Sequence, residues 1–356
     1  MKKTKGRFFF SLIIVILIII AVGGMTYSVF KSYLEKKGSS LMMGHSDHAT
    51  VSDERSEPLL DESEIDEEIK EQLDKATEES AIEESKETVS VDLIVFAGQS
   101  NMSGLGGDAA RAVTVKEGAG AEFRAVSDPT KLYTITEPFG FYENTETMND
   151  LFLKRGSLVS AFVNAYYEET GVPVIAVSAS KGGTPSTYWA TDIVGEDVVT
   201  RFINAKTWLK DNGYTVRNQF LVFLQGENDV LENVSTSQYL TDLNTFSSKM
   251  FYRGIDKFLM IRIGRTKEDP DAFKRIIDVQ TELCRTDPRF VLISTMLSAF
   301  GEEYMVDSYH YNQDALNALG TDAGLNAAKF AETRVDPQLI DYRTGETYIP
   351  DDRVLE

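Results

Sequence analysis

Five short apolar runs recur along the chain from about residue 89 onward. They are Val89–Phe96, Val172–Ser178, Phe220–Leu224, Phe258–Ile263 and Phe290–Ser294. Each run is almost continuously apolar and is bounded by Gly, Pro, Asn or Asp. Short runs without polar alternation are typical of strands that are buried on both faces of a parallel sheet.

Longer segments with helical spacing of their apolar residues separate these runs. They are Leu158–Glu169, Val198–Asn212, Tyr239–Phe251, Asp271–Cys284 and Asp314–Glu332. Alternating strands and helices predict a three-layer α/β/α domain around a doubly wound parallel sheet. We expect this domain over residues 89–335, followed by a C-terminal extension over residues 336–356.

The N-terminal pattern is different. Basic residues within positions 2–7 precede an apolar stretch over residues 8–25, which is at the short end of a bilayer span. Segment 1–30 is therefore an uncleaved transmembrane signal anchor or a cleaved signal peptide. We favour the anchor, because no A-x-A cleavage site ends the stretch. The basic flank predicts a single-pass protein of the cell membrane with its N-terminus inside and its catalytic domain outside. Secretion after cleavage is the alternative.

Residues 31–88 are rich in acidic side chains and poor in large apolar ones. Such a segment cannot bury enough apolar surface to offset the entropy of ordering, so we expect a disordered linker between membrane and domain. The whole chain has a formal net charge of −20, which argues against a nucleic-acid partner. Its one cysteine, Cys284, excludes an intrachain disulfide.

Residues suited to catalysis follow the first two runs. Ser100 comes just after the first run, between Gly98 and Gly104. A serine at such a tight turn can present its hydroxyl to solvent and its own N–H to a developing oxyanion. Alone, the same pattern fits an ordinary helix N-cap. After the second run, Gly182 and Gly183 either allow a ligand close to the backbone or form a flexible loop.

The third and fifth runs are also followed by polar residues. The side-chain amide of Asn228 can donate to an oxyanion, although the surrounding QGEND segment also fits a helix N-cap. His310 is the only histidine of the predicted domain, and Asp307 precedes it by three positions. A carboxylate at that offset can fix the imidazole tautomer that a general base needs. Because ligands bind beyond the carboxyl ends of such strands, these positions together predict a hydrolase site.

These motifs resemble the four blocks of the SGNH hydrolase superfamily. The blocks are Gly98–Asn101, Gly182–Gly183, Gly226–Asp229 and Asp307–His310. The forms GQSNMSG, KGGT followed by Trp189, and QGEND resemble carbohydrate esterase family 6. That family includes sialate O-acetylesterase-like (SASA) proteins and acetylxylan esterases. The resemblance covers about residues 91–330 and implies an SGNH/flavodoxin-like fold.

The resemblance also implies roles for the residues at these positions. Ser100 would be the nucleophile, His310 the general base and then the general acid, and Asp307 the residue that orients His310. Glu227 is an alternative acidic partner for His310, but the local spacing favours Asp307. No metal and no cofactor are implied.

The implied oxyanion hole combines the Ser100 N–H, the N–H of Gly183 or its neighbour Gly182, and the Asn228 side chain. Family 6 members often carry a small residue where Asn228 stands, so its role is taken from the wider superfamily. We expect nearby polar residues to support the site; these are Gln99, Asn101, Gln225 and Glu227.

The sequence therefore predicts a serine esterase that hydrolyses O-acetyl groups on a carbohydrate of the acetylxylan, sialate or wall-glycan type. The partners would be the acetylated glycan and, through residues 8–25, a membrane. Two other functions remain open: a catalytically inactive, membrane-tethered carbohydrate-binding protein, and an esterase acting on a non-carbohydrate ester. Phe141, Tyr188 and Trp189 either stack on a sugar ring or pack in the core. The sequence does not specify the glycan, the oligomeric state or whether the N-terminal segment is cleaved.

Overall fold

The computed structural model describes residues 88–150 and 153–351. The predicted anchor over residues 8–25 lies outside these ranges, as does the predicted linker up to residue 87. Within the described ranges, no helix is long and apolar enough to cross a membrane.

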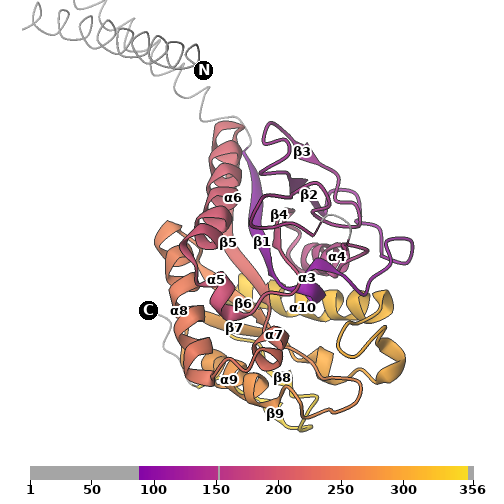
Figure 1. The fold of residues 1–356 in the computed structure, drawn as a ribbon. Helices are drawn as coiled ribbons and strands as arrows, with labels where there is room; N and C mark the ends of the chain where they lie inside the picture. The colour runs from indigo at the N-terminus through magenta and orange to yellow at the C-terminus, as the bar shows by residue number, and fades with distance from the viewer. Residues whose placement is uncertain (1–87, 151–152, 352–356) are drawn as a thin grey trace, which may run out of the picture. The chain divides into compact units, whose positions relative to one another are not determined.

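A central sheet organises the fold (Figure 1). Its strand order is β3-β2-β4-β1-β5-β6-β7, and neighbouring strands run parallel except for β2 and β3. The strands are β1 (Val89–Gly98), β2 (Gly120–Phe123), β3 (Leu132–Tyr133), β4 (Val174–Ser180), β5 (Tyr214–Leu224), β6 (Lys257–Ile261) and β7 (Phe290–Ser294). The predicted mixed α/β fold with a mainly parallel sheet is confirmed. The chain order reverses around β1, which lies between β4 and β5, so β1 occupies the position where doubly wound sheets bind ligands.

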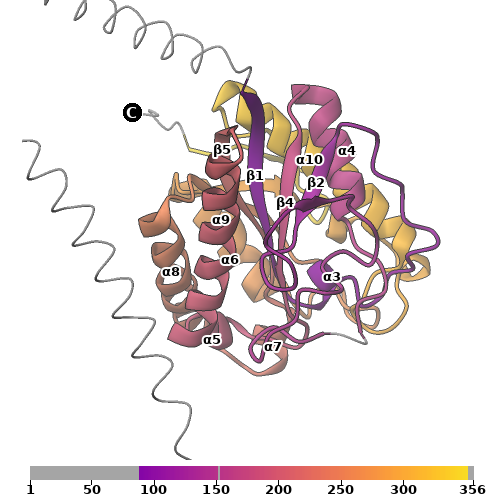
Figure 2. The ribbon, with the colours of Figure 1, turned by 90° about the horizontal axis from the view of Figure 1, so that it is seen from above.

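Helices cover both faces of this sheet (Figure 2). On one face lie α4 (Val159–Thr170) and α10 (Gln313–Thr333), and on the other lie α6 (Asp192–Asp211), α8 (Thr236–Arg253) and α9 (Lys274–Thr286). Gly320 and Gly324 let α10 approach α4 closely. A Cβ atom at these positions would lie 2.2 Å from the Leu158 carbonyl oxygen and 2.5 Å from that of Phe162, respectively.

Three short helices lie at the carboxyl ends of the strands. They are α3 (Ser100–Ser103), α5 (Ser186–Trp189) and α7 (Glu227–Leu231), which follow β1, β4 and β5 in the chain. Each contains or adjoins one of the sequence motifs. The motifs therefore lie together at the carboxyl ends of neighbouring strands.

Some elements differ from the sequence prediction. Strands β2 and β3 were not predicted, because they are too short to show a period and β2 carries the charged Glu122. Helix α6 begins six positions earlier than expected, at Asp192, because Gly195 and the two acidic residues after it interrupt the apolar spacing ahead of Val198. Strand β5 begins at Tyr214, ahead of the predicted Phe220, since its first half alternates between half-buried and exposed positions and only its second half is buried throughout.

Aromatic side chains pack together in the core near the carboxyl ends of the strands. Phe96 of β1 packs edge-on against Phe139 and Phe162, with ring centroids 5.8 and 5.2 Å apart. Trp189 is 1% exposed and packs against Phe223 and another core ring. Trp189 is therefore a core residue and not a platform for a sugar. Burying one such ring stabilises the fold by about 1.5–3 kcal/mol.

The segment after residue 335 packs on the domain. It forms a hairpin of β8 (Leu339–Ile340) and β9 (Thr347–Tyr348). Asp341 in its turn accepts two hydrogen bonds from the buried Arg262 guanidinium, at 2.5 and 2.7 Å. The described part of the predicted C-terminal extension is thus attached to the domain, while the predicted boundary at residue 335 stays a prediction.

Candidate active site

Two glycines shape the turn that carries Ser100. At Gly98 the backbone has a φ of +141°, and a Cβ there would lie 2.0 Å from the Leu224 carbonyl oxygen. Only glycine fits this position, so β1 can stay against β5 up to the turn. Helix α3 then runs from Ser100 to Ser103 and is capped by Gly104, which has a φ of +73°. This sharp strand-to-helix turn places Ser100 just beyond the carboxyl end of β1.

Ser100, His310 and Asp307 lie in hydrogen-bonding contact. His310 Nε2 is 2.8 Å from Ser100 Oγ, and His310 Nδ1 is 2.7 Å from Asp307 Oδ2. The second carboxylate oxygen of Asp307 accepts from the backbone N–H groups of Tyr309 and His310, at 3.0 and 2.8 Å. The carboxylate therefore fixes both the ring and the loop that carries it.

These contacts also keep Asp307 ionised. Burial alone would raise the pKa of Asp307, but the hydrogen bonds from the His310 ring and from two backbone N–H groups outweigh burial. The pKa of Asp307 consequently lies below its usual value. At neutral pH the carboxylate is negative and can accept from the imidazole N–H.

Asn101 ties the nucleophile turn to the histidine loop. Its side-chain amide donates to the Tyr309 carbonyl oxygen at 3.1 Å and accepts from the Tyr311 N–H at 3.3 Å. The same amide donates to Glu227 Oε1 at 2.8 Å. One side chain next to Ser100 thus contacts both neighbours of His310 and the helix that follows β5.

Glu227 lies at the centre of this network, and within the described residues its carboxylate makes no hydrogen bond to the imidazole. It is 1% exposed, and burial raises the pKa of its carboxyl group above the usual value. Its Oε1 accepts from Asn101, while its Oε2 has no hydrogen-bond partner within the described residues. Because Asp307 occupies the Nδ1 side of His310, the alternative in which Glu227 orients the histidine is not the arrangement of this structure.

Gln99 orients the side chain of Asn228. The Gln99 amide donates to Asn228 Oδ1 at 3.0 Å, and its own oxygen accepts from the Gly226 N–H at 3.1 Å. Gln225 also contacts this oxygen, at 3.5 Å. Since the oxygen of the Asn228 amide is engaged, the NH2 group is the end left to donate to another acceptor.

The two glycines after β4 differ in their hydrogen bonding. The Gly182 N–H donates to Asp150 Oδ2 at 2.6 Å. The N–H of Gly183 makes no hydrogen bond within residues 88–150 and 153–351, and Gly183 adopts a φ of +69° with open space around it. Asp150 was not predicted from the sequence, because it lies in an irregular loop that matches no motif.

Asp229 accepts hydrogen bonds from the segment that follows β4. It is fully buried, and its carboxylate accepts from the Ser186 N–H at 2.9 and 3.1 Å and from the Gln225 amide. Burial raises the pKa of this carboxyl group. The third motif therefore supports the second through a buried hydrogen bond.

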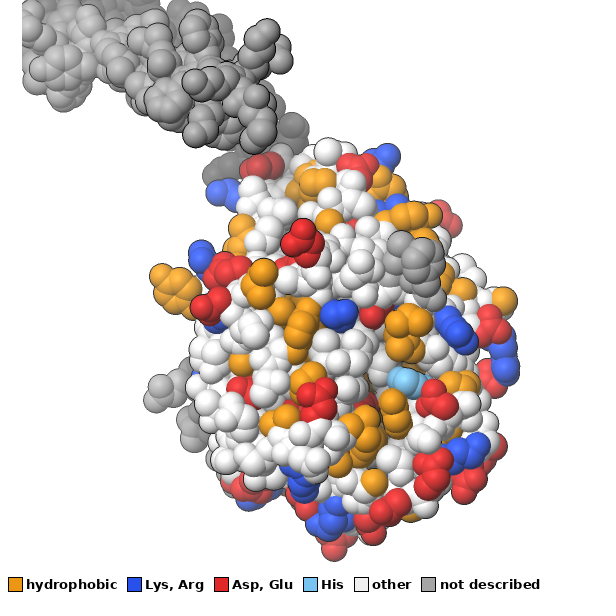
Figure 3. Space-filling model, in the orientation of Figure 1, with side chains coloured by type: hydrophobic (Ala, Val, Ile, Leu, Met, Phe, Trp, Pro, Cys, Tyr) orange, Lys and Arg blue, Asp and Glu red, His pale blue; other side chains and the backbone are white. Residues whose placement is uncertain are grey.

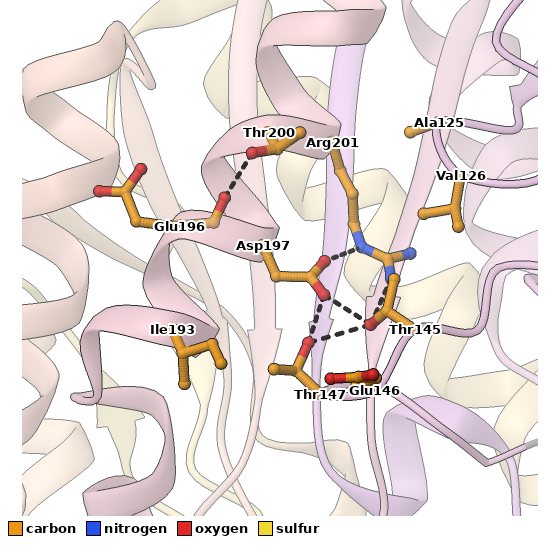
Figure 4. A pocket seen from close by; sticks show the side chains of 10 residues that line it. All are labelled: Ala125, Val126, Thr145, Glu146, Thr147, Ile193, Glu196, Asp197, Thr200 and Arg201. Carbon is orange, nitrogen blue, oxygen red and sulfur yellow. Dashed lines mark hydrogen bonds and ion pairs between the residues drawn. The ribbon is translucent and has the colours of Figure 1, made fainter. Parts of the chain in front are cut away.

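The imidazole is visible at the surface of the domain. Figure 3 shows it beside hydrophobic side chains and next to an acidic one, where the surface is hollowed. A separate cavity of about 380 Å³ lies between α6 and the loop around Thr145 (Figure 4). Its wall includes the buried pair of Asp197 and Arg201, at 2.5 Å, and neither Ser100 nor His310 lines it.

No metal centre is formed by the described part of the chain, which has no group of three or more His, Cys, Asp or Glu side chains arranged around a common point. The chemistry available at the strand ends is that of a hydroxyl, an imidazole, a carboxylate and several N–H donors. This set is suited to acyl transfer.

A family model described as SASA, "carbohydrate esterase, sialic acid-specific acetylesterase", matches residues 90–328. The chain belongs to this family of carbohydrate esterases. Residues 90–328 contain every motif described above, and the resemblance noted in the sequence is therefore confirmed.

The fold of this SASA domain is similar to that of a solved structure. A protein from Arabidopsis thaliana is 16% identical, with a TM-score of 0.52 over 67% of this chain and 98% of that chain. NanS is 13% identical, with a TM-score of 0.47 over 68% and 97%. A carbohydrate acetylesterase from Xanthomonas citri is 14% identical, with a TM-score of 0.43 over 70% and 58%. No match was found among curated proteins.

Proposed function

We propose that this protein is a serine esterase that hydrolyses O-acetyl groups on carbohydrate. The observation that carries the proposal is the contact of 2.8 Å between His310 Nε2 and Ser100 Oγ, with Asp307 bonded to the other ring nitrogen. Membership of a carbohydrate esterase family supports both the reaction and the class of substrate.

The reaction begins with a proton transfer. His310 takes the hydroxyl proton of Ser100 while Ser100 Oγ forms a bond to the acetyl carbonyl carbon. The tetrahedral intermediate collapses, the sugar oxygen leaves with the proton from His310, and an acetyl-enzyme remains. Water, deprotonated by His310, then attacks the acetyl group, and acetate and free Ser100 are released. Asp307 stabilises the imidazolium in both half-reactions.

The oxyanion hole consists of the Ser100 N–H, the Gly183 N–H and the Asn228 NH2 group. Gly183 is assigned in preference to Gly182 because the Gly182 N–H is already bonded to Asp150. One such donor typically lowers the activation barrier by about 2.7–4 kcal/mol. The bond from Gln99 supports the role of Asn228, since it occupies the amide oxygen and leaves the NH2 group as the free donor.

A catalytically inactive carbohydrate-binding protein is the competing function. Such a protein would not need the short contact between Ser100 and His310, nor the two backbone bonds that hold Asp307 in place. These contacts favour the enzyme. An esterase acting on a non-carbohydrate ester would use the same residues, and family membership is the argument against it.

Replacement of the nucleophile tests the activity. We expect Ser100→Ala to abolish hydrolysis of aryl acetates, with a loss of at least about 10⁴-fold in kcat. Ser90→Ala is the matched control, because Ser90 is exposed at the end of β1 that lies away from Ser100. Full activity in Ser100→Ala would disprove the mechanism.

A substrate panel tests the specificity. Acetate release is measured from acetylated xylan, O-acetylated sialic acid, O-acetylated cell-wall glycan and a lipid ester. We expect one of the glycans to give the highest kcat/KM. A preference for the lipid ester would leave the catalytic residues in place but overturn the assignment of a carbohydrate substrate.

A further inference from the structure

Asp150 contacts the two segments that flank the candidate nucleophile. Its Oδ2 atom accepts from the Ser103 hydroxyl of α3 at 2.7 Å and from the Gly182 N–H at 2.6 Å. Asp150 is 3% exposed, so both bonds are shielded from water. A single oxygen atom thus joins the helix that begins at Ser100 to the glycine turn.

The glycine turn lies directly against Ser100. A Cβ atom at Gly182 would be 3.5 Å from Ser100 Cβ, 3.5 Å from Asp150 Oδ1 and 3.1 Å from Leu105 Cδ2. The Gly182 peptide is therefore enclosed on three sides. A displacement of Gly182 would break the bond from its N–H to Asp150 and would also move the N–H of Gly183, which belongs to the next peptide.

The backbone of Asp150 is itself held in place. Its N–H donates to the Asn144 side chain at 3.2 Å, and its carbonyl oxygen accepts from the N–H groups of Leu153 and Lys154, at 2.8 and 3.2 Å. The buried ammonium group of Lys154 attracts the Asp150 carboxylate, and Lys154 Nζ is fixed by the Gly140 carbonyl oxygen at 3.1 Å. The carboxylate is thus a fixed point rather than a mobile surface group.

Further contacts anchor the same loop to the domain. Tyr188 donates its hydroxyl to the Thr147 carbonyl oxygen, and Thr145 donates to Asp197 on α6 at 2.6 Å. Asp197 in turn pairs with the buried Arg201. The segment from residue 144 to 150 is consequently connected to α6 at one end and to the glycine turn at the other.

We propose that Asp150 is a positioning residue for the oxyanion hole, which holds the Gly182 peptide so that the Gly183 N–H is the backbone donor presented beside Ser100. This inference rests on the proposed esterase function. Asp150 does not contact substrate; it acts through the glycine turn. Because a misplacement of about 1 Å at a catalytic donor can reduce the rate about 10²-fold, a bond that fixes this peptide has a direct effect on kcat.

The test compares two substitutions at position 150 in the full chain, with an aryl acetate as substrate. Asp150→Ala removes the acceptor, and we expect kcat to fall about 30- to 100-fold while KM changes less than about threefold. Asp150→Asn keeps an oxygen that can accept both bonds at the Oδ2 position. We therefore expect it to recover kcat to within about fivefold of the parent enzyme.

Two further variants complete the design. Ser103→Ala removes one of the two partners of Asp150, and we expect a smaller loss of kcat, about three- to tenfold. This variant carries the test if Asp150→Ala does not fold. Glu146→Ala is the matched control, because Glu146 is an exposed carboxylate on the same loop. Its kcat should stay within about twofold of the parent value.

The outcomes separate the inference from the function on which it rests. No hydrolysis by the parent enzyme would refute the esterase function itself. An active parent with an unchanged or higher kcat in folded Asp150→Ala would overturn the positioning role. The role would equally fail if folded Asp150→Asn were as slow as Asp150→Ala, or if KM rose while kcat stayed constant.

Discussion

At the scale of single residues, the candidate site depends on how each polar side chain is held. Asp307 uses both carboxylate oxygens, one for the ring and one for the backbone of the same loop. Asn101 joins Ser100's turn to both neighbours of His310. Gln99 orients the Asn228 side chain by donating a hydrogen bond to its amide oxygen. The reacting groups are thus oriented by amide and carboxylate side chains adjacent to them in the chain or in space.

Asp307→Asn tests whether the carboxylate fixes the imidazole. An asparagine oxygen can still accept from the Tyr309 and His310 N–H groups, so the loop should keep its shape. The amide cannot stabilise the imidazolium, and we expect kcat to fall about 10³- to 10⁴-fold with little change in KM. Steady-state kinetics with an aryl acetate measure this loss. A loss of less than about tenfold would mean that another group orients His310.

Glu227→Gln tests the effect of the buried carboxyl group on stability. Burial raises the pKa of Glu227 above the ordinary value of 4.5, so ionising it costs more in the folded than in the unfolded protein. The parent protein should therefore lose stability relative to Glu227→Gln as the pH rises from 4.5 toward the raised pKa, and the difference should then stay constant.

Urea unfolding of both proteins at acidic and neutral pH measures this difference. The expected sign is a greater relative stability of Glu227→Gln at neutral pH than near pH 4.5. The same difference in the free energy of unfolding at both values would show that Glu227 titrates normally in the folded protein.

At the scale of elements, the strand ends position the chemistry. β1, β4 and β5 each end in a turn that carries one motif, and Gly98 allows the first of these turns to pass against Leu224. The His310 loop reaches the same edge after β7 and is joined to α3 by Asn101. The site is therefore assembled from four separate parts of the chain by one sheet.

Gly98→Ala tests the need for close contact between β1 and β5. The added Cβ would lie 2.0 Å from a backbone oxygen that cannot move without disrupting the sheet, at a φ that other residues rarely adopt. We expect a loss of at least about 2 kcal/mol in the free energy of unfolding. Urea unfolding measures the loss.

Gly171→Ala is the matched control for this substitution. Gly171 also has a positive φ, +67°, but its Cβ would meet no atom within 4 Å. Only the backbone strain remains there, and it costs about 1–2 kcal/mol. Equal losses in the two variants would mean that the contact with Leu224 is relaxed at little cost.

The sequence predicted the elements that are long or strongly apolar. The five buried strands and five longer helices were found because their apolar residues are continuous or periodic. Strands β2 and β3 were missed because a run of two to four residues has no readable period. The glycine and the two acidic residues ahead of Val198 concealed where α6 begins.

In the candidate site, too, some residues could be predicted from the sequence and others could not. Ser100, the two glycines, Asn228 and His310 were recognisable, because each lies in a motif that follows a strand. Asp150 was not, since its role depends on a loop whose path is set by distant contacts with Tyr188 and α6. The choice between Asp307 and Glu227 likewise needed coordinates, because both carboxylates are close to the site.

At the scale of the whole molecule, the chain combines a SASA domain over residues 90–328 with an acidic N-terminal region that ends before β1. The domain carries all of the proposed chemistry. The apolar stretch over residues 8–25 and its basic flank predict a membrane anchor, and this stays a prediction. If it holds, the esterase would act on glycans at the outer surface of the membrane.

Cell fractionation tests the anchor. We expect the full chain to sediment with membranes and to be released by detergent but not by high salt, because an apolar span is held by burial and not by charge. A chain lacking residues 1–30 should be soluble. Mass spectrometry of the N-terminus identifies the alternative, since a mature protein that begins after the apolar stretch would mean that a signal peptide is removed.

The central claim is that Ser100 is a nucleophile activated by His310, and covalent labelling tests it most directly. The full chain is treated with an organophosphonate and the adduct is located by mass spectrometry. The account predicts a single adduct on Ser100 that forms at least about 10²-fold more slowly in His310→Ala. Hydrolysis of acetyl esters by a protein whose Ser100 stays unlabelled, or labelling that is equally fast without the imidazole, would contradict it.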